Sequence, residues 1–144
     1  MKIFLTILTV IWMIVIFMFS NSPADESSDL SNSFMKNTIV KIVKVFKKDL
    51  NEEEFMKKMS TPVRKLAHFT EYMILGVLLF LTLKQYGIDN KWIVILGCMI
   101  YASTDEIHQL FIEGRTGRIL DVFIDTIGSS FGVFITVMIN KIFH

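Results

Sequence analysis

Polar side chains that could carry out chemistry gather in two short stretches of an otherwise apolar sequence. RKLAHFTEY covers residues 64–72, and YASTDEIHQLFIEGRTGRILDVFID covers residues 101–125. These stretches hold histidines that can transfer protons, carboxylates that can activate a nucleophile and guanidinium groups that can bind phosphate. We expect one site, with catalytic candidates His68, Glu71, Asp105, Glu106, His108, Asp121 and Asp125, and substrate-binding candidates Arg64, Lys65, Tyr72, Gln109 and Arg115.

Three interpretations suit this set of side chains. One is a hydrolase or transferase in which His68 and His108 act as acid and base, because histidine titrates near neutral pH, at about 6.5. Another is a divalent cation, Mg²⁺ or Mn²⁺ on the oxygen ligands or Zn²⁺ if both histidines take part. The candidate metal ligands are His68, Glu71, Asp105, His108 and Asp121, in a spacing that matches no established metal motif. The third is a structural network in which the charges only pair with one another.

The composition indicates a small membrane protein of one domain, residues 1–144. The chain has 144 residues, of which 52% are hydrophobic and 20% charged. A net charge of +1 provides no basic field of the kind that binds nucleic acid. The single cysteine, Cys98, excludes a disulfide framework and a paired-cysteine metal site.

Four apolar stretches predict four transmembrane helices, because about 20 apolar residues cross a bilayer as a helix. They cover residues 3–19, 64–83, 92–111 and 119–139. The first is longer and bulkier than the core of a cleaved signal peptide, which favours an uncleaved helix. Residues 20–61 are expected outside the membrane. Within them, residues 34–46 predict a basic amphipathic helix that lies on the membrane surface or packs on the protein, with Ile39, Ile42, Val43 and Phe46 on its apolar face. The predicted fold is thus an all-α membrane protein.

The polar residues are all expected at one face of the membrane. Consecutive membrane helices run antiparallel, and the charges lie at the start of the second helix, the end of the third and the start of the fourth. Helical spacing gives three stripes: Arg64, His68, Glu71 and Tyr72; Asp105, His108 and Gln109, with Glu106 to the side; and Asp121 and Asp125. Beyond these acids, Gly128 and Gly132 form a GxxxG surface that a neighbouring backbone can approach closely. The sequence therefore predicts a polar pocket beside a tightly packed helix pair.

Both polar stretches also carry the pattern of a known family. RKLAHFTEYMILG at residues 64–76 and STDEIHQLFIEGRTGRILDVFIDTIG at residues 103–128 resemble the VanZ-like family of small bacterial membrane proteins. Glu113 departs from the pattern, since members commonly have proline before the glycine and arginine found here as Gly114 and Arg115. The resemblance does not cover residues 32–59.

The resemblance implies a multi-pass protein of the bacterial cytoplasmic membrane, and its founding member is associated with low-level teicoplanin resistance. It implies no particular reaction. We expect a pocket that acts on or binds a lipid-linked or phosphate-bearing substrate, with membrane lipid and a lipid-linked cell-wall precursor as partners. The alternative is a non-catalytic membrane protein that binds an envelope precursor, an antibiotic or a protein partner.

Charges around the first helix predict a cytoplasmic N-terminus. Lys2 precedes this helix, whereas Asp25, Glu26 and Asp29 follow it, and the positive side is normally cytoplasmic. The full count opposes this orientation, because most of the 15 lysines and arginines lie on the side of the long segment. Since that rule weakens for long loops, we expect the N-terminus inside and the pocket outside.

Overall fold

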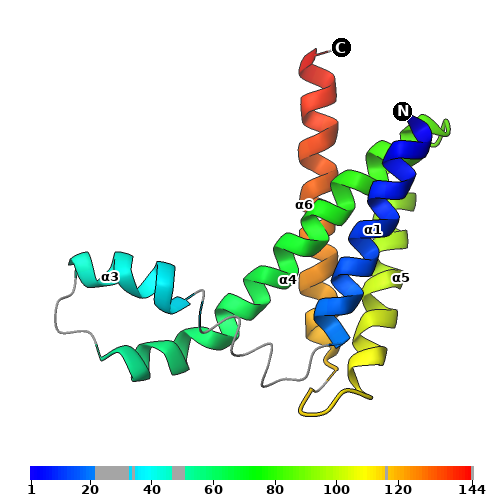
Figure 1. Cartoon of the computed structure of the whole chain (residues 1–144). Helices are drawn as coiled ribbons and strands as arrows, with labels where there is room; N and C mark the ends of the chain where they lie inside the picture. The colour runs from blue at the N-terminus through cyan, green and yellow to red at the C-terminus, as the bar shows by residue number, and fades with distance from the viewer. Residues whose placement is uncertain (22–32, 34, 47–50, 116, 144) are drawn as a thin grey trace.

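The computed structural model is helical throughout, apart from its short connections, in the residues that it describes: 1–21, 33, 35–46, 51–115 and 117–143 (Figure 1). In chain order the elements are α1 (Lys2–Asn21), the π-helical turn η1 (Met35–Ile39), α3 (Val40–Phe46), α4 (Glu52–Gln85), α5 (Lys91–Gln109) and α6 (Ile119–Phe143). The all-α prediction is therefore confirmed over these residues.

Helices α1, α4, α5 and α6 form a bundle (Figure 1). The most extensive contact is between α4 and α6, which cross each other, while α1 packs on α4 and α5. Both chain termini lie at one end of the bundle, and the connection from α5 to α6 lies at the other end (Figure 1). The end of α1, the start of α6 and residues 64–72 of α4 therefore meet the end of α5 in the region where the sequence places its polar residues.

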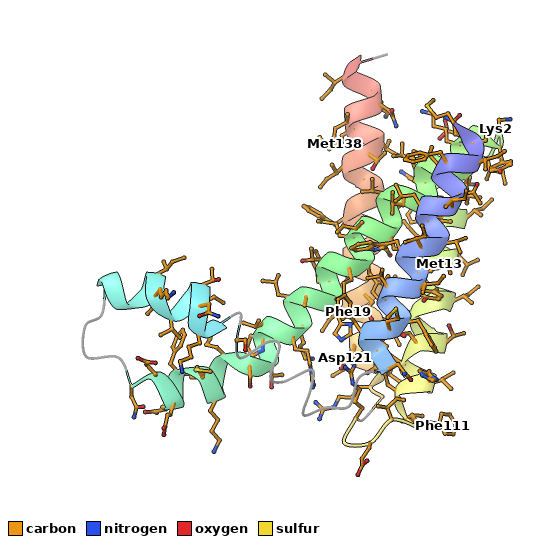
Figure 2. The ribbon with its side chains drawn as sticks, viewed as in Figure 1. Lys2, Met13, Phe19, Phe111, Asp121 and Met138 are labelled. Atoms are coloured by element: carbon orange, nitrogen blue, oxygen red, sulfur yellow. The ribbon has the colours of Figure 1, made fainter. Side chains whose placement is uncertain are left out.

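Three of these helices are long and apolar enough to cross a membrane: Lys2–Asn21, Glu52–Gln85 and Ile119–Ile142. The predicted fourth span, α5, is not among them, and its last turns carry Asp105, Glu106, His108 and Gln109. Length and composition thus support three membrane helices, and a fourth stays a prediction. Large apolar side chains such as Phe131 and Met138 are exposed on α6, as expected for a surface that contacts lipid (Figure 2).

Helix α4 begins at Glu52, well before residue 64, where the apolar stretch led us to place the start of the membrane segment. The Asn51 side chain accepts a hydrogen bond from the backbone N–H of Glu54 at 3.4 Å, which caps the helix. Glutamates in the first turn add to this by their favourable interaction with the helix dipole. Pro62 lies inside the helix, where its missing N–H removes one backbone hydrogen bond without ending the helix.

Two glycines allow α4 and α6 to approach at backbone distance. A β-carbon on Gly128 would meet the backbone carbonyl oxygen of Phe69, and one on Gly132 would meet that of Met73. Small residues let membrane helices pack this closely, where dispersion contacts and weak polar interactions replace the hydrophobic effect. The predicted close packing at the GxxxG surface is confirmed.

The segment between α1 and α4 is helical where the structure describes it. Residues of the predicted amphipathic helix form η1 and α3, which lie to the side of the bundle, and η1 contacts α4 (Figure 1). Val40 is buried, whereas Ile42, expected on the apolar face, is 57% exposed. Residue 34 and the Phe46 side chain fall outside the described part. The position of this segment on a membrane surface therefore stays a prediction.

Candidate functional site

A polar pocket lies at the end of the bundle where α4, α5 and α6 meet the connection from α5 to α6. Its described lining consists of Arg64, Lys65, His68, Glu106, Gln109, Gly114, Arg115, Asp121, Ile124 and Asp125. Asp121 marks the region in Figure 2, at the same end of the bundle as Phe19 and Phe111. The structure thus gathers most of the predicted site residues here, but Glu71, Tyr72, Asp105 and His108 are not part of this lining.

Local helix geometry explains how the lining residues meet. Arg64, Lys65 and His68 lie within little more than one turn of α4, and Asp121 and Asp125 are one turn apart near the start of α6. Arg115 follows Gly114, whose φ of 72° lies in the left-handed region that glycine adopts readily. The connection can therefore turn back and bring the guanidinium group to the two helices.

An ion pair joins two helices at the pocket. Lys65 Nζ lies 2.8 Å from Asp121 Oδ1, and the two side chains are 32% and 20% exposed. A partly exposed pair of this kind contributes little to stability, about 1 kcal/mol or less, because water screens it. It does, however, already neutralise much of the charge that Lys65 could offer a ligand.

Glu106 accepts a hydrogen bond from the backbone N–H of Arg118 at 2.8 Å. This contact places a carboxylate beside the start of α6, where the helix dipole favours negative charge. As the helical spacing predicts, Glu106 lies to the side of the stripe that holds Asp105 and His108. Glu106 is buried and lines the pocket. Glu106 therefore has a structural partner as well as access to the pocket.

Asp125 is the most deeply buried acid of the pocket, with an exposed fraction of 1%. Neither carboxylate oxygen has a hydrogen-bond partner among the described residues, although the residue lines the pocket. A buried carboxylate without a partner is costly, so such groups normally pair with a cation or a donor. Asp125 therefore has unused capacity to accept hydrogen bonds from a ligand.

Arg115 fixes the connection against the end of α1 by donating a hydrogen bond to the Phe19 carbonyl oxygen at 2.8 Å. Burial lowers the pKa of Arg115, and the nearby charge of Arg64 lowers it further. Because an arginine side chain stays protonated in proteins, the two guanidinium groups remain charged side by side. Two such groups form a favourable environment for a phosphate or carboxylate.

His68 lines the pocket, and Glu71 lies one helical turn behind it. The distance from His68 Nδ1 to Glu71 Oε2 is 3.6 Å, too long for a hydrogen bond, and both atoms are buried with no hydrogen-bond partner among the described residues. Hydrogen bonds between catalytic groups are often this long before a substrate binds. The arrangement is that of a proton-transfer group with a carboxylate to orient it.

Asp105 lies in a buried network between α1 and α5 that adjoins the pocket through Gln109. Ser20 Oγ donates to Asp105 Oδ2 at 2.6 Å, and Gln109 Nε2 donates to Ser20 Oγ at 2.9 Å and to the same Asp105 oxygen at 3.3 Å. Sequence reasoning missed Ser20. Its position at the end of the first apolar stretch, on the side of the polar cluster, was the available signal.

His108 and Tyr72 also lie away from the pocket. His108 Nε2 is 3.2 Å from Asn21 Oδ1, and its ring stacks near Phe17 with centroids 4.7 Å apart. Tyr72 is fully buried in the apolar core beside Tyr101. The predicted pairing of His68 with His108 as acid and base therefore has no support in the geometry.

The predicted metal ligands are distributed over these different environments. His68 and Asp121 line the pocket, whereas Asp105 belongs to the buried network and His108 faces α1. Among the described residues, no group of three or more histidine, cysteine or acidic side chains is arranged to hold a metal ion. We therefore derive no step that uses a metal.

Comparison with known proteins gives one match. The VanZ/LLP1 family matches residues 5–140, which include both polar stretches, the four bundle helices and the segment between α1 and α4. No curated protein and no solved structure matches the chain. Because the match covers nearly the whole sequence, and three helices are apolar and long enough to cross a membrane, this membrane protein belongs to the VanZ/LLP1 family.

Proposed function

We propose that this protein binds the phosphate-bearing headgroup of a lipid-linked substrate in its polar pocket. One observation carries the proposal: the guanidinium groups of Arg64 and Arg115 line the same pocket at one end of an apolar bundle. Charged groups in a membrane protein are costly and usually mark function. Guanidinium groups bind phosphate through two parallel hydrogen bonds, so this pair suits a lipid phosphate better than a neutral ligand.

The same pocket offers acid–base chemistry on the bound phosphate. His68 would take a proton from an attacking water or hydroxyl group, and Glu71, 3.6 Å behind it, would orient the imidazole ring. These two groups support hydrolysis or transfer at the phosphate. The water or hydroxyl oxygen would bond to phosphorus, the bond from phosphorus to the leaving oxygen would break, and the imidazolium would return its proton to that leaving oxygen. The second candidate is binding without reaction. In its favour, Asp105, one of the predicted catalytic acids, does not line the pocket and accepts hydrogen bonds from Ser20 and Gln109 instead.

A role in the cell envelope follows from this choice of ligand. A lipid-linked cell-wall precursor carries phosphate at the membrane surface, so the protein would act beside cell-wall synthesis. We extend the proposal to reduced teicoplanin susceptibility, which rests on the VanZ/LLP1 family match.

Binding of phosphatidic acid should test the pocket directly. We expect Arg115→Gln to weaken binding about ten-fold or more, because a hydrogen bond to a charged group is lost. Arg118→Gln is the matched control: it removes the same charge from the same connection, but its side chain is exposed and outside the pocket lining. Because exposed charges contribute little, that variant should stay within about two-fold of wild type.

Native mass spectrometry of the detergent-purified protein, titrated with phosphatidic acid, provides this measurement. Thermal unfolding of both variants shows whether each remains folded. Equal losses in the two variants would contradict a specific phosphate site, and no binding of any phospholipid by wild type would overturn the proposed function. Teicoplanin susceptibility of cells that express the same variants tests the extension to resistance.

We also propose that α5 crosses the membrane as a fourth span, with the N-terminus in the cytoplasm. The 19 residues of α5 reach about 28 Å at a rise of 1.5 Å per residue, close to the hydrocarbon thickness of about 30 Å. Both termini lie at one end of the bundle, as an even number of spans requires (Figure 1). The pocket would then face the outside, where it would meet cell-wall precursors.

Cysteine labelling in intact cells tests this topology. A membrane-impermeant maleimide should label Glu113→Cys, in the connection beside the pocket, without permeabilisation. It should label Asp89→Cys, between α4 and α5, only after permeabilisation. The parent chain is the control, because its single cysteine, Cys98, is fully buried. If both variants were labelled without permeabilisation, or both only after it, the fourth span would be contradicted, and the reverse pattern would invert the orientation.

A further inference from the structure

The charges of the pocket lining balance, but they are not equally available to a ligand. The lining contains three basic residues, Arg64, Lys65 and Arg115, and three acidic residues, Glu106, Asp121 and Asp125. Lys65 forms an ion pair with Asp121 at 2.8 Å, and Glu106 accepts a hydrogen bond from the Arg118 backbone N–H at 2.8 Å. The acid that remains without a hydrogen-bond partner among the described residues is Asp125. The pocket therefore combines two guanidinium groups, of which that of Arg115 also binds the Phe19 carbonyl oxygen, with a separate, buried acceptor.

The depth of Asp125 separates it from the ion pair. Asp125 lies one turn further along α6 than Asp121, and its exposed fraction is 1%, whereas the Asp121 side chain is 20% exposed. Both Asp125 oxygens are buried without a described partner in the wall of the pocket. A group that enters past the Lys65–Asp121 pair would meet this carboxylate.

We propose that the ligand headgroup carries an ammonium group as well as a phosphate, so that Asp125 receives the ammonium while Arg64 and Arg115 hold the phosphate. This inference rests on the proposed function and adds the ligand class. It names a zwitterionic, amine-bearing phospholipid headgroup, such as that of phosphatidylethanolamine, as the recognised chemistry.

The chemistry of a carboxylate explains the choice of an ammonium group. An ionised carboxylate only accepts hydrogen bonds, and an ammonium group only donates them while also supplying the opposite charge. A nearby ammonium group would stabilise the ionised form of this buried carboxylate, whereas a ligand hydroxyl would satisfy one oxygen and supply no charge. A ligand with phosphate alone would add a second negative charge near Asp125, whereas a zwitterion satisfies both parts of the pocket.

Wild-type lipid preference tests the inference without any substitution. The detergent-purified protein is titrated with phosphatidylethanolamine, phosphatidylglycerol and phosphatidic acid, and bound lipid is measured by native mass spectrometry. We expect phosphatidylethanolamine to bind about ten-fold more tightly than phosphatidylglycerol, since only the former supplies an ammonium partner to Asp125. Equal or tighter binding of phosphatidylglycerol would overturn the inference and leave the proposed function standing. If none of the three lipids binds, the proposed function itself fails.

Asp125→Asn identifies the residue responsible, because it removes the charge and keeps the size. The preference for phosphatidylethanolamine should fall to about one, while binding of phosphatidylglycerol persists because the arginines remain. Glu113→Gln is the matched control, an exposed acid of the adjacent connection that does not line the pocket, and should keep the wild-type preference. A full preference in Asp125→Asn would overturn the assignment. Asp125→Ser provides a second variant if the asparagine variant does not fold.

Soluble phosphoethanolamine separates a lipid from a free headgroup as the source of this chemistry. It carries the same ammonium group, with a phosphate monoester in place of the phosphodiester of the lipid, and has no acyl chains. We expect it to displace phosphatidylethanolamine only at concentrations about a hundred-fold higher or more, because acyl chains add apolar contact with the bundle. Competition at equal concentration would overturn a lipid as the ligand.

Discussion

Gly132→Ala should lower the free energy of unfolding by about 1–3 kcal/mol or more, since it overpacks a backbone contact. The added β-carbon would meet the Met73 carbonyl oxygen and then the Val77 side chain. A backbone group cannot rotate away as a flexible side chain can, so α4 and α6 must separate. Because these two helices share the most extensive contact of the bundle and both line the pocket, the change should also weaken lipid binding.

Thermal unfolding of the protein in detergent measures this effect. Gly97→Ala is the matched control, since its β-carbon would meet only a Leu79 side-chain carbon at an ordinary 3.6 Å. That substitution should be neutral or stabilising by up to about 1 kcal/mol, because alanine favours a helix more than glycine does. If Gly132→Ala were as stable as Gly97→Ala, the close approach of α4 and α6 would be wrong.

Asp105→Ala should destabilise the protein by about 1.5–3 kcal/mol, the contribution of hydrogen bonds to a charged group. The substitution removes the acceptor for Ser20 Oγ and Gln109 Nε2, which are both buried. Ser20→Ala should destabilise in the same direction. The double variant should lose less than the sum of the two single variants, because both break one network.

Thermal unfolding of the two single variants and the double variant measures this coupling. Ser103→Ala is the control on α5, since its hydroxyl bonds only the Met99 carbonyl of its own helix, at 2.8 Å, among the contacts described. The isosteric change Asp105→Asn separates the structural from the catalytic interpretation. Loss of lipid binding in Asp105→Asn at unchanged stability would return Asp105 to the pocket chemistry, contrary to the structure.

The placement of the polar groups at one end of the bundle was predictable from the sequence. It depends only on which end of each helix carries charge and on the antiparallel order of consecutive helices. The contact at Gly128 and Gly132 was predictable for a similar reason, because small residues four apart mark a close helix pair. Both inferences use spacing along one helix and need no knowledge of its rotation.

The division of the acids between the pocket and the buried network was not predictable in this way. Polar residues at positions 105, 106, 108 and 109 span an arc of about 160° around α5, at 3.6 residues per turn, so the sequence does not fix which of them faces α6 and which faces α1. The structure turns Glu106 toward α6 and His108 toward α1. Likewise, Ser20 gains its role only when α1 docks beside α5, a contact between residues far apart in the chain.

The length of α4 has a mechanical consequence. Its 34 residues extend about 51 Å, well beyond the hydrocarbon thickness of about 30 Å, so a single rod joins the region of η1 to the pocket. The weakest point of that rod is at Pro62, where one backbone hydrogen bond is missing, directly before Arg64 and Lys65. A force that tilts the first turns of α4 would therefore bend the rod at Pro62 and move Arg64 and Lys65, two cations of the pocket lining. A movement of the segment outside the membrane would therefore shift the cations of the pocket on α4, while the acids of the pocket on α5 and α6 could stay in place.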